Sequence, residues 1–170
     1  SLEIQRKREE WQKSILLLVK LAYCLHSQPQ PAWAEAFSAS QEAVRLLLEV
    51  QNKVQLLQTL AQLTWLCERC PQPEWEHVIS CCRAALQLLT TPEDRAERAT
   101  TLYLLAYCPH HQPQPVWEEA IRASTEALEM LRDAGQESGL KESLHQLASL
   151  LEDQPAADTH AAIAHWQEAA

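Results

Sequence analysis

The segment HSQPQPAW (residues 26–33) recurs along the chain, and this recurrence decides the fold. Its copies read ERCPQPEW at 68–75, HHQPQPVW at 110–117 and, in a weaker form, EDQPAADT at 152–159. Each copy begins 42 residues after the one before it, without any insertion. Four such units account for nearly all of the 170 residues, so the sequence predicts a repeat architecture.

The residues before each proline-rich segment have the apolar spacing of a helix. A leucine is followed three residues later by another leucine and then directly by a small residue, which places all three on one helix face. These positions are Leu18, Leu21, Ala22; Leu60, Leu63, Thr64; Leu102, Leu105, Ala106; and Leu144, Leu147, Ala148. A second helical stripe starts at Trp33, Trp75, Trp117 and Thr159, and no stretch has the period of a strand.

One unit is therefore a helix hairpin, and hairpins of this kind bury their faces by stacking on one another. We predict an all-α, right-handed α-solenoid of about four antiparallel helix hairpins, forming one domain. The expected parts are an N-terminal helical extension at 1–12 and repeats at 13–54, 55–96, 97–138 and 139–170, the last one truncated. The missing initiator methionine and the interrupted last repeat predict an excerpt of a longer protein, with apolar surface exposed at the terminal hairpins.

Turn residues support these boundaries. Prolines at 31, 73 and 115 are expected near the first turn of each second helix, where their missing N–H is not needed. Thr91-Pro92-Glu93 has the composition of a helix cap and first turn, and the stretch from Gly135 to Gly139 is the corresponding break one repeat later. Between the first two repeats, only Asn52 is a plausible turn residue.

Composition excludes several classes of function. With two glycines in the chain, neither a dinucleotide-binding fingerprint nor a P-loop can be written. The formal charge of −9 argues against nucleic acid and anionic membranes as partners. No apolar run approaches the roughly 20 residues of a membrane span, and the charged N-terminus does not have the pattern of a signal peptide.

The repeat resembles the tetratricopeptide-repeat (TPR) family. The resemblance rests on the leucine and small residue of each first helix, such as Leu21-Ala22, and on an aromatic residue followed by small residues in the second. The latter pattern is met by Trp33, Ala36, Ser40, Ala43, by Trp117, Ala120, Ser124, Ala127, and less strictly by Trp75, Val78, Cys82, Ala85. The period is 42 residues instead of about 34, and the loop is longer, proline-rich and without glycine. The resemblance implies a non-catalytic scaffold for peptides or partner proteins, with the first helices lining a concave groove.

Six cysteines raise the alternative of a metal site. Cys67, Cys70, His77, Cys81 and Cys82 include enough nitrogen and sulfur donors for zinc. The repeat register favours a structural role instead, because all of the cysteines except Cys70 share columns with leucine, alanine or serine in other repeats. We therefore expect Cys24 and Cys108, which align with leucines, to lie in the core. No metal, cofactor or catalytic group is predicted, and unpaired core thiols favour a reducing, cytoplasmic location.

Aromatic and histidine side chains recur on the first helices, on the face turned away from the leucine stripe. We predict that this face binds the partner, because aromatic rings offer rigid apolar area at little entropic cost. The predicted partner-binding residues are Val19, Tyr23, His26, Ala61, Trp65, Tyr103, Tyr107, His110 and His145. The alternative is that these rings only pack between neighbouring first helices.

The sequence thus predicts a protein–protein interaction scaffold that holds a peptide or partner segment in its groove. The alternative is a regulatory or oligomerisation arm of a larger signalling or effector protein, acting through the solenoid ends or the convex face. Self-association through the terminal repeats is a further expectation.

Overall fold

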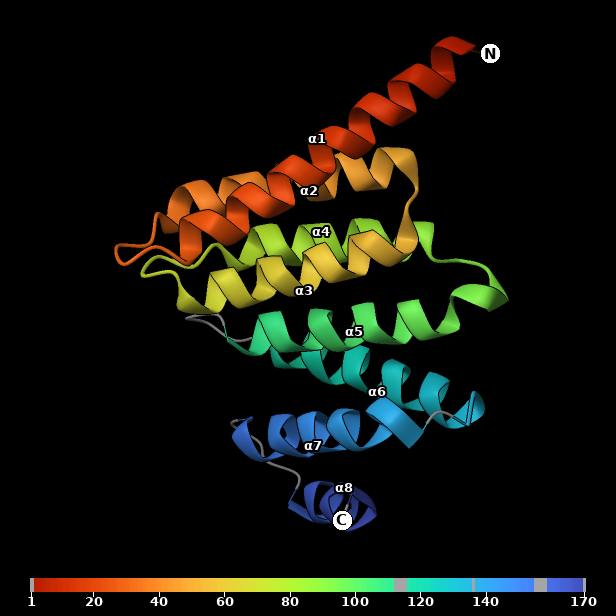
Figure 1. Ribbon diagram of the computed structural model, residues 1–170. Coiled ribbons are helices and arrows are strands. Elements are labelled where there is room, and N and C mark those ends of the chain that lie inside the picture. The colour runs from red at the N-terminus through yellow and green to blue at the C-terminus, as the bar shows by residue number, and fades with distance from the viewer. Residues whose placement is uncertain (1, 112–115, 136, 155–158, 170) are drawn as a thin grey trace. The chain divides into compact units, whose positions relative to one another are not determined.

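The computed structural model describes residues 2–111, 116–135, 137–154 and 159–169, and all regular structure within them is helical. The prediction of an all-α fold is confirmed for this part of the chain. The α-helices are α1 (Leu2–His26), α2 (Trp33–Val50), α3 (Lys53–Arg69), α4 (Trp75–Leu88), α5 (Arg95–His110), α6 (Trp117–Asp133), α7 (Glu137–Asp153) and α8 (Thr159–Ala169), and a short 3₁₀ turn η1 (Pro92–Asp94) precedes α5 (Figure 1).

The chain divides into two compact units, Ser1–Leu88 and Leu89–Ala170. In the first unit α1 packs on α2, α2 on α3, and α3 on α4 (Figure 1). In the second unit α5 packs on α6, α6 on α7, and α7 on α8. Each unit therefore contains two successive helix hairpins, and in each the second helix of one hairpin packs on the first helix of the next.

The helix starts follow the predicted repeat. The second helices begin at Trp33, Trp75, Trp117 and Thr159, which are 42 residues apart, as the sequence predicts. The predicted extension at 1–12 is helical over its described residues and continues without a break into α1. The periodicity therefore fixes both the helical content and the register of the hairpins.

Side-chain caps separate the helices where the sequence places turn residues. At the end of α2, Gln51 takes a left-handed conformation with φ of 56°, and the Asn52 side chain then accepts a hydrogen bond from the backbone N–H of Gln55 at the start of α3. Before α5, the Asp94 carboxylate accepts hydrogen bonds from both the backbone N–H and the hydroxyl of Thr91, at 3.1 and 2.8 Å.

The predicted glycine-containing break is shorter in the structure, because Gly135 lies between α6 and α7 whereas Gly139 lies in the first turn of α7. Gly135 and Gly139 have φ of 62° and 92°, values that side chains with a Cβ rarely adopt. Pro31 and Pro73 directly precede the first turns of α2 and α4. The prediction for Pro115 lies outside the described residues.

The leucine stripe forms the core, with exceptions at both ends of the chain. Leu60, Leu63, Leu102, Leu105, Leu144 and Leu147 are buried, as are all four small residues of the next column. The expected burial is wrong at Leu21, which is 49% exposed, because α1 packs mainly on α2 whereas α3 packs on both α2 and α4. Ile163 of α8 is equally exposed, although Phe37 and Ile79, at the same position of the repeat, are buried.

Candidate functional site

A groove opens between α1 and α3, the first helices of the two hairpins in the first unit. It has a volume of about 560 Å³. Its lining consists of Val19, Lys20, Tyr23, Cys24 and His26 from α1 and of Gln62 and Trp65 from α3. Four of the predicted partner-binding residues of this unit thus line one groove, and the fifth, Ala61, is exposed on α3 but is not part of the lining.

Ring contacts hold the floor of this groove in place. The Trp65 ring is met edge-on by His26, with ring centroids 4.7 Å apart, and is covered by the Arg69 guanidinium, 4.6 Å from its centroid. Trp33 lies 6.4 Å from the same ring. Tyr23 touches His26 with centroids 5.0 Å apart, yet its side chain is 63% exposed. Trp65 is therefore fixed by its neighbours, while Tyr23 offers most of its surface to a ligand.

The groove also contains residues that the repeat columns did not single out. Lys20, Cys24 and Gln62 each lie one helical position beyond a predicted column, and a lining face is wide enough to include them. The expectation that Cys24 lies in the core is wrong, because Cys24 is exposed. Its column is buried at Leu66 on α3, because α3 packs on both α2 and α4, whereas α1 packs mainly on α2.

In the second unit a different pocket includes Tyr103. This pocket, of about 400 Å³, lies between α5 and α7 and is closed by Leu131 at the end of α6. Most of its wall is small, with Ala96, Ala99, Thr100, Gly139 and Ser143, and its polar members include Glu142. Burial and the nearby Glu142 carboxylate both raise the pKa of Tyr103, in that order of importance, so the phenol stays neutral.

The other predicted residues of the second unit have ring partners of their own. Tyr107 stacks on His111 with centroids 3.8 Å apart, and His145 packs against Trp166 at 4.8 Å. The His110 ring lies 5.1 Å from Trp117, and its Nε2 is 3.2 Å from an Asp153 carboxylate oxygen.

The His110 imidazole is held in its neutral form. Burial and then the adjacent His111 lower the pKa of His110, and together they outweigh the opposing effect of Asp153. In this unit the predicted residues therefore lie at a pocket around Tyr103 and in separate ring pairs at the other positions.

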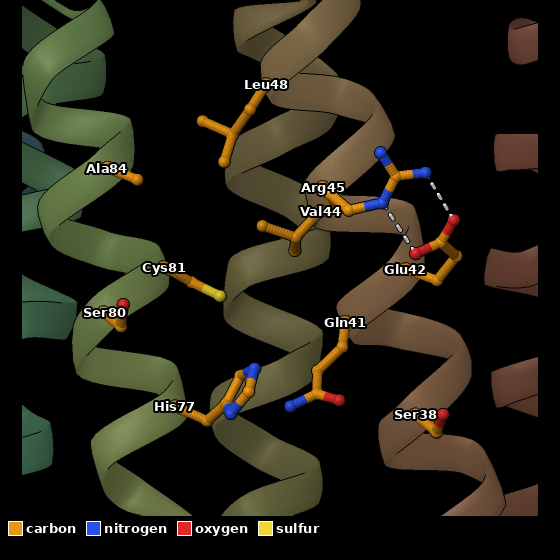
Figure 2. Close-up of a pocket in the computed structure, with 10 residues that line it drawn as sticks. All are labelled: Ser38, Gln41, Glu42, Val44, Arg45, Leu48, His77, Ser80, Cys81 and Ala84. Carbon is orange, nitrogen blue, oxygen red and sulfur yellow. Dashed lines mark hydrogen bonds and ion pairs between the residues drawn. The ribbon is translucent and has the colours of Figure 1, made fainter.

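A third cavity lies on the second-helix face of the first unit, between α2 and α4. It has a volume of about 370 Å³. Figure 2 shows His77 and Cys81 extending from α4 toward α2, whose contribution includes Gln41, Val44 and Leu48. Burial raises the pKa of Cys81, which keeps its thiol protonated. A protonated thiol beside an exposed histidine does not provide an activated nucleophile.

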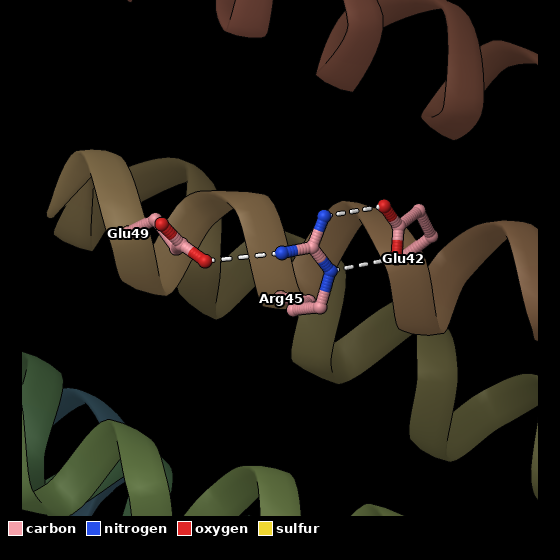
Figure 3. Close-up of polar contacts among 3 residues, drawn as sticks. All are labelled: Glu42, Arg45 and Glu49. Atoms are coloured by element: carbon pink, nitrogen blue, oxygen red, sulfur yellow. Dashed lines mark hydrogen bonds and ion pairs between the residues drawn. The ribbon is translucent and has the colours of Figure 1, made fainter.

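Charged side chains form the rim of this third cavity. Arg45 donates hydrogen bonds to both carboxylate oxygens of Glu42, at 2.8 and 2.6 Å, and another to Glu49 at 3.0 Å (Figure 3). The Arg45 hydrogen bonds lower the pKa of Glu42. Because all three side chains are about half exposed, this ladder along one helix contributes little to stability.

The cysteines named for a zinc site do not converge. Cys67 and Cys82 are buried, and burial raises the pKa of the Cys67 thiol to about 12. The thiol of Cys70 points instead to the Gln72 carbonyl oxygen, 3.4 Å away. Within the described part of the chain, no three His, Cys, Asp or Glu side chains are grouped so that they could hold a metal ion.

The described helices include none with the length and apolar character needed to cross a bilayer. A scan against protein-family models finds no match to the chain, and a search of curated proteins finds none either.

Proposed function

We propose that the chain is a non-catalytic binding scaffold of the TPR-like solenoid type, which holds a peptide or partner segment in the groove between α1 and α3. The observation that carries the proposal is the position of Tyr23, which is largely exposed at the groove while the opposing Trp65 is fixed by His26 and Arg69. A rigid aromatic floor beside a free aromatic wall is the arrangement that concentrates binding energy at protein interfaces.

The groove has the size and chemistry for part of a peptide. Its volume of about 560 Å³ lies within the range of known ligand pockets, and its lining is mostly apolar with Lys20 and Gln62 at the margin. An apolar peptide side chain would bury its surface between Tyr23 and Trp65, and the marginal polar groups would meet the peptide backbone or an acidic neighbour.

The test is a peptide-display selection on the 170-residue chain, followed by binding measurements on variants. The double variant Tyr23→Ala, Trp65→Ala is expected to weaken the binding of the selected peptides at least about tenfold. The reason is that hot-spot aromatics contribute about 2 kcal/mol or more to binding. Leu17 and Val54 provide the matched control, since they are exposed apolar residues on α1 and α3 outside the groove lining.

Binding that is unchanged in the groove variant, or that is lost equally in Leu17→Ala, Val54→Ala, would refute the proposal. Circular dichroism of both double variants establishes that the helices remain intact. This control matters because Trp65 is in contact with three other side chains.

A second candidate function is an oligomerisation arm, which the exposed ends favour. Leu16, Leu17 and Leu21 are 47%, 67% and 49% exposed on α1, and a shallow groove of about 590 Å³ lies between α1 and α2. Sedimentation at several protein concentrations tests this candidate, and a monomer at every concentration would exclude it.

We also propose a cytoplasmic location for the protein. The proposal is supported by the use of Cys67, Cys82 and Cys108 as buried core thiols.

A further inference from the structure

The two units carry very different charges. The segment 1–88 has nine basic and nine acidic side chains, whereas 89–170 has five basic and fourteen acidic ones. The whole formal charge of −9 therefore belongs to the second unit. A partner of this unit gains long-range attraction if it is basic, and that attraction raises its rate of association.

Within the acidic unit, one exposed carboxylate lines a pocket. Glu142 lies on α7 and lines the cavity of about 400 Å³ opposite Tyr103 of α5. Its carboxylate forms no hydrogen bond or ion pair with any described residue, in contrast to Glu126 and Glu168, which pair with Arg98 and Arg132. Glu142 thus offers an unneutralised negative charge at the mouth of a preformed cavity.

The remaining walls suit a long side chain with a charged end. Ala96, Ala99 and Leu131 are apolar and offer contacts to methylene groups. Gly139, with φ of 92°, lines the α7 side of the cavity without a side chain, beside the Leu131 methyl groups. The Tyr103 ring is half-buried, and its negative π face is a surface on which a cation can rest.

From this geometry we propose that the pocket between α5 and α7 binds an arginine or lysine side chain of a basic peptide segment, with Glu142 pairing with the cationic group and Tyr103 packing against it. The half-buried phenol of Tyr103 stays neutral, because burial and then the Glu142 carboxylate raise its pKa. The inference rests on the proposed function in that both place a partner along the first helices, but it concerns a separate pocket in the other unit.

The experiment is an NMR titration of the ¹⁵N-labelled 170-residue chain with the peptide acetyl-Gly-Arg-Gly-amide. Amide shifts are expected to concentrate at Thr100, Tyr103, Glu142 and Ser143 and to saturate. The uncharged peptide acetyl-Gly-Gln-Gly-amide is expected to cause no saturating shifts at these residues. Shifts spread evenly over the acidic unit, or equal shifts from both peptides, would overturn the proposal.

Two charge-matched variants separate the pocket from general attraction. Glu142→Gln is expected to weaken the binding of the arginine peptide about fivefold. Glu137→Gln removes the same charge from the same helix outside the pocket, and it is expected to change the binding of this peptide less than about twofold. Equal effects of the two variants would show attraction to net charge alone and would refute the site.

The role of the ring has its own test. Tyr103→Phe keeps the aromatic face and is expected to retain binding, while Tyr103→Leu is expected to lose it; retention in both would exclude a contact with the ring. Because the titration does not involve Tyr23 or Trp65, its failure leaves the groove of the first unit untouched. Conversely, a failure at Tyr23 and Trp65 leaves the arginine pocket intact.

Discussion

The same substitution at two equivalent repeat positions is predicted to have very different costs. Leu21 and Leu63 occupy the same column of the 42-residue repeat, but Leu21 is 49% exposed and Leu63 is fully buried. Truncating Leu63 to alanine removes about three buried carbon groups, or about 2.4 kcal/mol of transfer free energy, and leaves a cavity that raises the total to about 3–4 kcal/mol. At Leu21 about half of the transfer term remains and no cavity forms, so the cost is about 1 kcal/mol.

Urea unfolding followed by circular dichroism measures this difference. Leu63→Ala is expected to lower the transition midpoint by about 1–2 M, and Leu21→Ala by about 0.5 M or less. Because both variants exchange leucine for alanine within a helix, the effect of helix propensity cancels between them. Leu147→Ala, at the same column in the second unit, identifies which transition belongs to which unit.

Equal losses of unfolding free energy in Leu21→Ala and Leu63→Ala would refute the conclusion that this face of α1 is exposed. If the loss of unfolding free energy in Leu21→Ala then decreased on dilution of the protein, a second copy of the chain would be what covers Leu21.

Two further predictions concern a strained cap and a buried histidine. Gln51→Gly is expected to stabilise the first unit by about 0.5–1 kcal/mol, because glycine adopts the left-handed φ of 56° without the penalty of a Cβ; an unchanged or lower urea midpoint would contradict this. For His110, the folded-state pKa lies below the ordinary value of 6.5, so the unfolded chain binds more protons and stability is lost as pH falls through that value and below. An NMR titration of the His110 ring is expected to give a depressed pKa that Asp153→Asn depresses further, and a pKa above 6.5 would show that the ion pair dominates.

Periodicity predicts the helices well because it reports what every repeat shares. The 42-residue spacing locates the starts of all four second helices, since the loop that precedes them has the same composition each time. The small column at Ala22, Thr64, Ala106 and Ala148 is buried throughout because it lies where helices approach most closely.

The repeat pattern does not predict whether a given helix has a neighbour that covers it. Leu21 and Cys24 have the column identities of core residues, yet the helix that would cover them has no counterpart beside α1 among the described residues. The same reasoning applies to Ile163 at the other end of the chain. A column therefore predicts the direction of a side chain, while burial depends on the rest of the array.

The candidate sites were only partly predictable for a related reason. The sequence singles out Tyr23 and Trp65 because their column is aromatic in successive repeats. The sequence does not single out Glu142, because its column reads Leu16, Gln58, Thr100 and Glu142, which suggests no common chemistry. Ring partners such as His111 and Trp166 come from outside the first-helix columns, so the separate pairs of the second unit left no periodic signal.

The length of α1 has a consequence for its cooperativity. The helix has 25 residues, and within the stretch from Arg6 onward Ile15 is the first fully buried side chain, so the turns between Arg6 and Ser14 gain little from tertiary contacts. A segment supported mainly by its own hydrogen bonds opens by local fraying, at a small fraction of the free energy needed to unfold the hairpin. Amide protons along α1 should therefore exchange with solvent in a gradient, fastest near Arg6 and slowing sharply at the turn that contains Ile15.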